Sequence, residues 1–302
     1  MRSVPPSSRC LSEVGELMSI RRKIICENSK GQRITIGYQK PYWLTSVDGI
    51  GSPQFTVYTS KGAYQDGEIY TGTTAEKRNI LLSIGICGNF VDNWDYLCSV
   101  LRPNDKGTLY YFHGNTVRKI NYYLESLSLA DSNTVVKAVT ASLICPNPFF
   151  EALEEQQADL STWRGNITFP LRLHNPFTVG QKVNSLITNV YNPGDVAVGM
   201  KVRMVANASV SNPSLLNVDT GETMRISVDM GIGDQIIVTT HMGNKEVALI
   251  RNGQQTEINQ YWDYTSTWIQ LREGDNVLKY DAESGADNLS VSIYFTPAYW
   301  EV

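Results

Sequence analysis

Residues 79–101 read NILLSIGICGNFVDNWDYLCSVL, and the spacing of the apolar residues changes within this stretch. In its first part the apolar residues occupy every second position: Ile80, Leu82, Ile84 and Ile86. This two-residue period predicts a strand with one buried face. From Phe90 the apolar residues recur at helical spacing until Pro103 interrupts them, which predicts a helix over 89–101 with Asn89 as its N-terminal cap.

Short strand patterns lie on both sides of this stretch. They are rich in β-branched and aromatic residues that alternate with polar ones, and turn residues separate them. The predicted strands are 33–38, 53–59, 108–112, 117–129 and 134–144. Residues 108–129 predict a hairpin, because the turn at 113–115 separates two alternating runs. The first half of the chain is therefore predicted to contain strands, one helix and further strands.

The second half has a different rhythm of short strands. Turn signals such as NPGD at 192–195 separate strand-like runs that follow one another closely. The runs are 166–173, 198–205, 223–228, 235–240, 246–250, 266–271, 276–280 and 289–295. That rhythm predicts a β-sandwich or jelly roll. Between the halves, residues 151–160 are acidic and polar with some helical character, which predicts a connector.

Length and charge describe a folded protein of two domains. A chain of 302 residues favours two units, each large enough to bury its own core. Residues 1–150 carry 16 Lys and Arg against 12 Asp and Glu, a net charge of +4, whereas residues 151–302 carry 10 against 18, a net charge of −8. The net charge of +4 on the first half is too small to indicate a surface that binds nucleic acid. The asymmetry fits contact between copies or with a charged partner, or it only keeps each surface soluble.

Two further features concern the cellular compartment. No stretch approaches the roughly 20 apolar residues that cross a bilayer, so we expect no membrane insertion. The N-terminal residues include Glu13 and Glu16 among few apolar residues, so we expect no secretion signal. The five cysteines contain no Cys-x-x-Cys pair, which fits reduced thiols in a protein that is made in a cytoplasm.

The sequence contains no recognisable catalytic or metal-binding motif. Its three histidines, His113, His174 and His241, stand far apart and have no ligand spacing, so no metal site is predicted. Gly231 and Gly233 lack the third glycine and the context of a dinucleotide fold, so no cofactor is predicted. A carboxylate pair of a cell-wall hydrolase is defined by distance in space, so that hypothesis stays open with little support. We therefore predict a protein that is not an enzyme and has no catalytic residue.

An aromatic group crowds a short segment of the second half, at Tyr261, Trp262, Tyr264 and Trp268. Exposed rings on a sandwich stack on sugar faces, so Tyr261, Trp262 and Tyr264 are the candidate contacts to a glycan or a protein partner. The alternative for Tyr261 and Trp262 is packing within a loop. Trp268 opens the apolar run of a predicted strand and is interpreted as a core residue.

Five stretches in a fixed order carry a resemblance to a known family. In the first half they are the opening strand pair with its strand and helix, the hairpin GTLYYFHGNTVRKINYYLESL at 107–127, and the junction ASLICPNPFF at 141–150. In the second half they are the NPGD turn and the hairpin STWIQLREGDNVLKY at 266–280. Their order resembles the distal tail protein family of siphophage-type tails, and residues 1–17 look additional to the family pattern.

The resemblance implies a mainly β fold, with an N-terminal β-barrel or split-barrel domain that carries one helix, followed by a galectin-like β-sandwich. It implies a structural virion protein that forms a homohexameric ring at the distal end of a phage tail and is assembled in the bacterial host cytoplasm. The implied partners are other copies, the tail tube protein, the tail hub or tail-associated lysin, and fibre or receptor-binding proteins. The alternative function, which rests on the aromatic group, is a carbohydrate-binding module for host cell-wall sugars.

The predicted organisation has four parts. They are an N-terminal arm at 1–18, a ring-forming barrel domain at 19–150 with the helix at 89–101, a connector at 151–164 and the sandwich at 165–302. We expect the arm to lie against another subunit, because it has few apolar groups with which to fix itself. We expect the mildly positive first domain to build the ring and the acidic sandwich to meet the outer partners.

Overall fold

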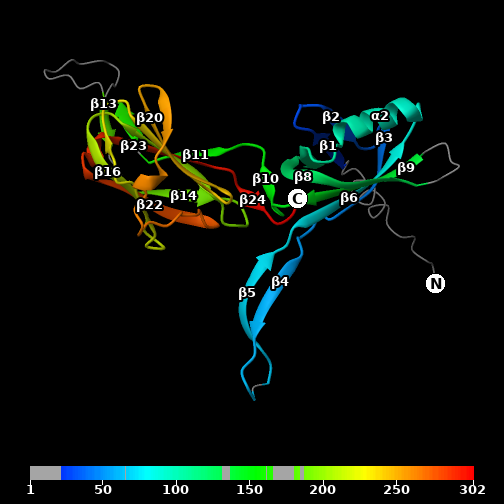
Figure 1. The fold of residues 1–302 in the computed structure, drawn as a ribbon, viewed down its shortest axis with the longest axis horizontal. Helices are drawn as coiled ribbons and strands as arrows, with labels where there is room; N and C mark the ends of the chain where they lie inside the picture. Colours follow the sequence, from blue (N-terminus) through cyan, green and yellow to red (C-terminus); the bar gives the residue numbers. More distant parts are fainter. Residues whose placement is uncertain (1–21, 65, 131–136, 161, 166–179, 184–186) are drawn as a thin grey trace, which may run out of the picture. The chain divides into compact units, whose positions relative to one another are not determined.

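The computed structural model describes residues 22–64, 66–130, 137–160, 162–165, 180–183 and 187–302 (Figure 1). The chain divides into two compact units. Unit 1 comprises Met1–Leu153 and Tyr299–Val302, and unit 2 comprises Glu154–Ala298. Unit 2 is therefore inserted in the sequence between the body of unit 1 and the last four residues, which belong to unit 1. None of the helices in the described part of the chain is long and apolar enough to cross a membrane.

Unit 1 contains one large antiparallel sheet and one separate two-stranded sheet. Its strands are β1 (Lys23–Glu27), β2 (Arg33–Ile36), β3 (Tyr42–Asp48), β4 (Phe55–Ser60), β5 (Ile69–Ala75), β6 (Arg78–Ile86), β7 (Lys106–His113), β8 (Thr116–Leu129), β9 (Lys137–Cys145) and β10 (Phe150–Ala152). The main path runs β2-β1-β7-β8-β9-β6-β3, and β10 pairs with β8 beside it. Only isolated bridges join Gly37 and Tyr38 to Trp43, so the described strands do not form a closed barrel.

The core of unit 1 lies on the face of the sheet that the alternating pattern predicts. Ile80, Leu82, Ile84 and Ile86 of β6 are each at most 1% exposed. They pack in one cluster with apolar residues of β1, β2, β7, β8 and β9. The prediction of a strand with one buried face is confirmed, and burial of each such side chain contributes about 1.5–3 kcal/mol.

The predicted helix forms as α2 (Phe90–Val100) and covers part of this core. Leu97 and Val100 are buried, and Phe90 and Trp94 pack on the cluster from the helix face. Asn89 occupies the N-cap position, but its side chain makes no capping hydrogen bond. The predicted N-cap position of Asn89 is confirmed, but the side-chain hydrogen bond of a cap is absent, and the Asn89 amide donates to the Asp92 carboxylate at 2.5 Å.

Unit 2 is a sandwich of antiparallel sheets. Its strands are β11 (Gln156–Asp159), β12 (Thr162–Gly165), β13 (Gly180–Val183), β14 (Ile187–Asn192), β15 (Met200–Ala206), β16 (Val210–Asn217), β17 (Thr223–Arg225), β18 (Asp229–Met230), β19 (Gln235–His241), β20 (Asn244–Arg251), β21 (Gln254–Glu257), β22 (Gly274–Ser284), β23 (Leu289–Phe295) and β24 (Ala298–Tyr299), of which the last ends in unit 1. One sheet runs β11-β23-β15-β19-β20-β21 and another β14-β22-β16-β17, with β18 beside β16. The strands β12 and β13 pair separately, and η1 (Asn259–Tyr261) and η2 (Ala286–Asn288) are short 3-10 turns. Alternate residues of β15 and β23 are buried, as a sandwich requires.

The NPGD turn lies between β14 and β15, which belong to different sheets of unit 2. Asn192 is 1% exposed, and its amide donates to the carbonyl oxygens of Val196 and Leu271 at 3.0 and 3.2 Å. Its side-chain oxygen accepts from the N–H of Gly194 at 3.0 Å. A Cβ on Gly194 would lie 2.5 Å from the carbonyl oxygen of Ala298, so this position excludes larger residues. The turn is thus held by buried polar contacts rather than by exposure to water.

Several strand predictions differ from the structure. Residues 266–271 form no strand beyond one bridge at Leu271, and β17 stops at Arg225 although a strand was predicted to 228. The prediction at 166–173 lies outside the described residues. The stretch predicted as the connector, 151–164, contains most of β10, all of β11 and most of β12, with no helix in its described residues. Its role as a boundary stays a prediction.

Candidate assembly surfaces

Among the described strands, the hairpin of β4 and β5 has no sheet neighbour on either side. The two strands pair only with each other, and Figure 1 shows them as a long ribbon that extends beyond the rest of unit 1. Every residue of β4 and β5 is exposed or half-exposed. An isolated two-stranded hairpin is marginally stable in water, because neither face buries apolar area.

Apolar side chains nevertheless project from both faces of this hairpin. Val57 and Tyr58 are successive residues of β4 and are 58% and 49% exposed. In β5, Ile69 and Tyr70 are 58% and 64% exposed. Because successive residues of a strand point to opposite faces, both faces carry one member of each pair. Exposed apolar groups gathered on one element are typical of a surface that another molecule covers.

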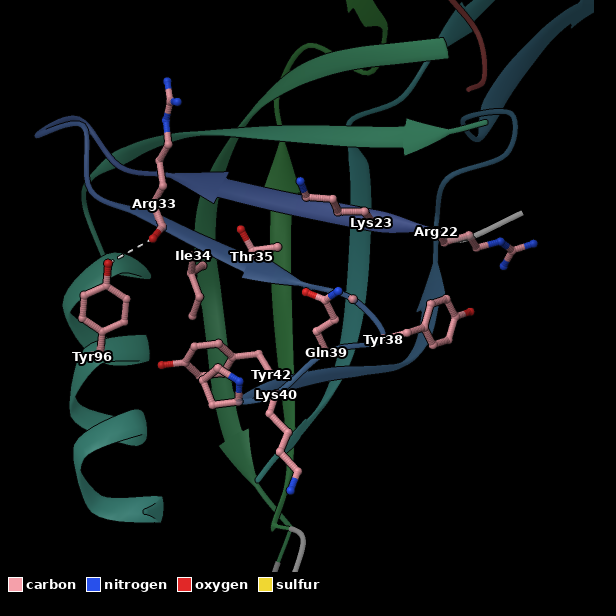
Figure 2. A pocket seen from close by; sticks show the side chains of 12 residues that line it. Arg22, Lys23, Arg33, Ile34, Thr35, Tyr38, Gln39, Lys40, Tyr42 and Tyr96 are labelled. Carbon is pink, nitrogen blue, oxygen red and sulfur yellow. Dashed lines mark hydrogen bonds between the residues drawn. The ribbon is translucent and has the colours of Figure 1, made fainter. Parts of the chain in front are cut away.

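A second feature of unit 1 is a groove of about 910 Å³ beside β2 and the helix α2 (Figure 2). Its lining comprises Arg22, Lys23, Arg33, Ile34, Thr35, Gly37, Tyr38, Gln39, Lys40, Pro41, Tyr42 and Tyr96. The strand β2 is an edge strand, because β1 is its one neighbour in the sheet path. An edge strand presents backbone N–H and C=O groups on its free side.

The walls of the groove are fixed by tyrosine hydroxyls. Tyr96 of α2 donates to the carbonyl oxygen of Arg33 at 3.0 Å, a contact drawn in Figure 2, and Tyr42 donates to the carbonyl oxygen of Asn93 at 2.8 Å. Four lining residues are cationic and none is acidic. The guanidinium of Arg33 pairs with Glu27 at 2.8 Å, whereas Lys40 has no ion-pair partner among the described residues. The groove therefore favours an extended, acidic segment.

The aromatic residues singled out in the sequence lie in unit 2. Trp262 stacks on Trp268 with ring centroids 4.1 Å apart and an interplanar angle of 7°. Both indoles are half-buried, and Lys245 lies over the Trp268 ring at 5.8 Å. Tyr261 is 45% exposed and Tyr264 is 96% exposed, so they are accessible.

The interpretation of Trp268 as a core residue is therefore wrong. Ile269 and Leu271 are fully buried, and Trp268 precedes them out of phase and half-exposed. Its ring packs on Trp262 instead of entering the core. The role of Tyr261, Trp262 and Tyr264 as partner or glycan contacts stays a prediction.

The titratable groups of the described residues do not assemble a reactive site. No group of three or more His, Cys, Asp or Glu residues in this part of the chain could hold a metal ion. Burial raises the pKa of the Cys26 and Cys145 thiols to about 12, which keeps them protonated at neutral pH. Hydrogen bonds from Arg251, at 2.7 Å, and from the N–H of Gly231 lower the pKa of the Asp234 carboxyl. The same hydrogen bonds hold the turn before β19 in place.

Two family models match the chain, one in each half. The model described as a phage tail protein RIFT-related domain matches residues 29–145. The model described as the C-terminal domain of a siphovirus-type tail component matches residues 193–299. Comparison with curated protein sequences gave no match. The two matched ranges together span most of the chain and occur one after the other.

Two solved structures share the fold. The Dit protein of phage SPP1, described as a paradigm of the hub adsorption apparatus in phages that infect Gram-positive bacteria, matches with a TM-score of 0.66 and 16% identity over 91% of this chain and 98% of that chain. A chain of the baseplate of phage P2 in its activated, Ca-containing conformation matches with a TM-score of 0.50 and 10% identity over 94% of this chain and 100% of that chain. At these identities the likeness concerns the fold.

Sequence reasoning found only part of these surfaces. The strand at 53–59 was predicted and corresponds to β4, but its partner β5 was missed, because IYTGTTA has little apolar alternation. The groove was also missed, since β1 and β3 were not predicted. The available signal was the concentration of Arg22, Lys23, Arg33 and Lys40 near Tyr38 and Tyr42.

Proposed function

Because the chain belongs to the siphovirus-type tail components and is a structural protein of the distal end of a phage tail, we propose that it closes into a homohexameric ring. As a tail component it is part of the virion. Its ring would join the tail tube protein on one side to the tail hub or tail-associated lysin, and to fibre or receptor-binding proteins, on the other. We further propose that the chain itself has no catalytic activity, which the two family models support because both describe tail components.

The observation that carries the ring proposal is the two-faced exposure of the β4–β5 hairpin. A closed ring of identical copies needs a heterologous contact, in which one surface meets a different surface of the next copy. A projecting hairpin with exposed Val57, Tyr58, Ile69 and Tyr70 supplies one of the two surfaces. Covering these side chains would remove apolar area from water at about 25 cal/mol per Å².

The groove beside β2 supports the proposal as a receiving surface. It offers the edge of β2, where Tyr96 already occupies the carbonyl oxygen of Arg33, and four cationic residues in a domain whose net charge is positive. The β4–β5 hairpin carries Glu68 near its tip and ends at Glu76, and both carboxylates accept hydrogen bonds only from exposed threonines of the hairpin among the contacts of the described residues. The charges of the two surfaces are therefore complementary, which favours register and rate of association.

The comparisons do not favour the alternative, a carbohydrate-binding module. Both family models describe tail components, and they cover the two halves of the chain. Of the candidate contacts, Trp262 stacks one face of its ring on Trp268, so that face is not available to a sugar. We therefore keep the ring as the proposed function.

The test is the mass of the protein in solution, measured by light scattering and checked by electron microscopy. We expect rings of about six copies of the 33.7 kDa chain. The quadruple variant Val57→Ser, Tyr58→Ser, Ile69→Ser, Tyr70→Ser should be monomeric with an unchanged melting temperature, since these side chains bury little in one copy.

The matched control is Ile232→Ser with Met242→Ser, which changes side chains that are 81% and 97% exposed in turns of unit 2. This control should still form rings. A parent protein that stays monomeric at high concentration and with its tail partners would contradict ring formation. Rings formed by the quadruple variant would remove the hairpin from the contact.

A further inference from the structure

The last four residues of the chain, Tyr299–Val302, are bound to unit 1 by several contacts. The guanidinium of Arg118 in β8 lies 3.6 Å from the ring centroid of Tyr299. The same guanidinium donates a hydrogen bond to the carbonyl oxygen of Glu301. Val302 is partly buried and packs against the core of unit 1. The chain end is therefore held at its main chain and at its side chains.

Trp300 makes the contact that reaches the β4–β5 hairpin. Its ring lies in edge contact with Phe55 and with Phe149, each at a centroid distance of 5.1 Å. Phe55 is the first residue of β4, and Phe149 directly precedes β10. One indole thus joins the base of the hairpin to the end of the sheet.

The buried side chain of Arg78 forms hydrogen bonds with three segments of this region. It is 3% exposed, and its Nη2 donates to the carbonyl oxygen of Trp300 at 2.5 Å. Its Nη1 donates to Gly49 O at 2.7 Å and to Gly51 O, and its Nε donates to Pro148 O at 2.7 Å. Residues 49–51 lead from β3 into β4, so the buried guanidinium links the chain end to the segment that enters the hairpin.

Among the described strands, β4 and β5 have no sheet partner besides each other, so the contacts at their base are the ones that connect them to unit 1. The main-chain bond from Glu76 N to Gln54 O closes its base at 2.8 Å, and beyond this point β4 and β5 pair only with each other. The direction in which a two-stranded hairpin leaves a sheet is set at its base, because it has no neighbour farther out. Residues that fix the base therefore fix the direction.

We propose that Tyr299–Val302 is a strap that positions the β4–β5 hairpin for docking, with Trp300 and Arg78 as its positioning residues. This inference rests on the proposed function, since it assigns the strap to the hairpin that joins copies. The strap lowers the conformational entropy that the hairpin loses on docking, so it strengthens assembly without touching the neighbouring copy. Residues 299–302 thereby set the orientation of the hairpin whose first strand begins at Phe55.

The test compares Trp300→Ala with Trp262→Ala, which removes a half-buried, stacked indole of unit 2. Amide hydrogen exchange is measured by mass spectrometry on both variants under conditions where the protein is monomeric. We expect exchange of residues 55–75 to become about tenfold faster in Trp300→Ala, with β7 and β8 unchanged. Trp262→Ala should leave exchange of 55–75 at the parent rate. Equal protection of 55–75 in Trp300→Ala and the parent would overturn the strap.

Phe55→Ala provides a second variant in case Trp300→Ala fails to fold. Phe55 is 37% exposed, so its loss spares the core while it removes the same ring contact. It should accelerate exchange of 55–75 in the same way, and unchanged exchange would again overturn the strap. Ring formation is scored separately on each variant.

The two readouts separate the strap from the proposed function. Faster exchange with weaker assembly supports the strap and its role in docking. Faster exchange with unchanged assembly keeps the contact but overturns its role in docking, and it also counts against the hairpin as the ring contact. Weaker assembly with unchanged exchange overturns the strap while the ring stands.

Discussion

The hairpins β4–β5 and β7–β8 belong to the same unit and obey the same pairing rules, yet they have opposite environments. In β7–β8 the buried residues alternate, and β1, β9 and β10 pair with the outer edges. In β4–β5 no residue is buried, and no third strand from the described part of the chain pairs with it. The apolar content is similar, because both hairpins carry tyrosines and β-branched residues.

The difference shows that apolar residues in a strand predict that some surface covers them. They do not predict whether that surface belongs to the same chain or to another molecule. Ile120 of β8 is 1% exposed because the core of its own chain covers it. Ile69 of β5 is 58% exposed, and it contributes to stability only when another copy or partner covers it.

The largest expected effect separates these two isoleucines. Ile120→Ala should lower the free energy of unfolding by about 2–5 kcal/mol, because it leaves a cavity in a packed core. Ile69→Ala should change it by less than about 0.5 kcal/mol in the monomer. Urea unfolding of both variants under monomeric conditions measures the difference. Equal losses for the two variants would mean that the hairpin is buried within its own chain in solution.

A smaller effect is expected at the groove. Lys40→Glu places a negative charge where the hairpin's carboxylates are proposed to dock, and it should weaken assembly about tenfold, or about 1.4 kcal/mol. The loss should shrink in high salt, since Lys40 is exposed. Lys201→Glu, on an exposed position of β15, is the matched control and should assemble normally. Sedimentation at two salt concentrations measures the assembly of both variants. Equal assembly of Lys40→Glu and Lys201→Glu would exclude the groove as the receiving surface.

The smallest effect concerns a tyrosine of the sheet. Burial raises the pKa of Tyr42 to about 12 from an ordinary value of 10.0, with smaller contributions from Tyr96 and Cys98. The folded state therefore keeps a proton that the unfolded chain loses, so this stabilisation is complete below pH 10 and is lost as the pH rises towards 12.

Tyr42→Phe removes the hydrogen bond to Asn93 and should cost about 1 kcal/mol at pH 8. The difference between Tyr42→Phe and the parent should become smaller between pH 10 and pH 12, because the parent alone loses the contribution of this proton. Urea unfolding at pH 8, 10 and 11 measures it. A difference that stays constant over this range would show that Tyr42 does not contribute to the alkaline loss.

Several features of the candidate surfaces were beyond sequence reasoning for identifiable reasons. Trp268 was expected in the core because apolar residues follow it, yet a stacked partner six residues earlier holds it outside. Arg78 gave no signal, since a buried guanidinium with carbonyl partners depends on chain segments that are far apart in sequence. Asn89 occupies the predicted N-cap position, but its side-chain oxygen accepts no capping hydrogen bond, and its amide donates to Asp92 instead.

The sequence by itself determined the alternation of β6, the position of the helix α2, the β7–β8 hairpin and the order of elements that resembles the tail-protein family. These features depend on residues that are close in the chain, so period and turn chemistry suffice to predict them. Only the tertiary structure decided which apolar strands are covered and which stay exposed, and that Tyr299–Val302 returns to unit 1. Burial is a property of the whole packed chain, and a local pattern of apolar residues is the same whether its partner is the chain's own core or another molecule.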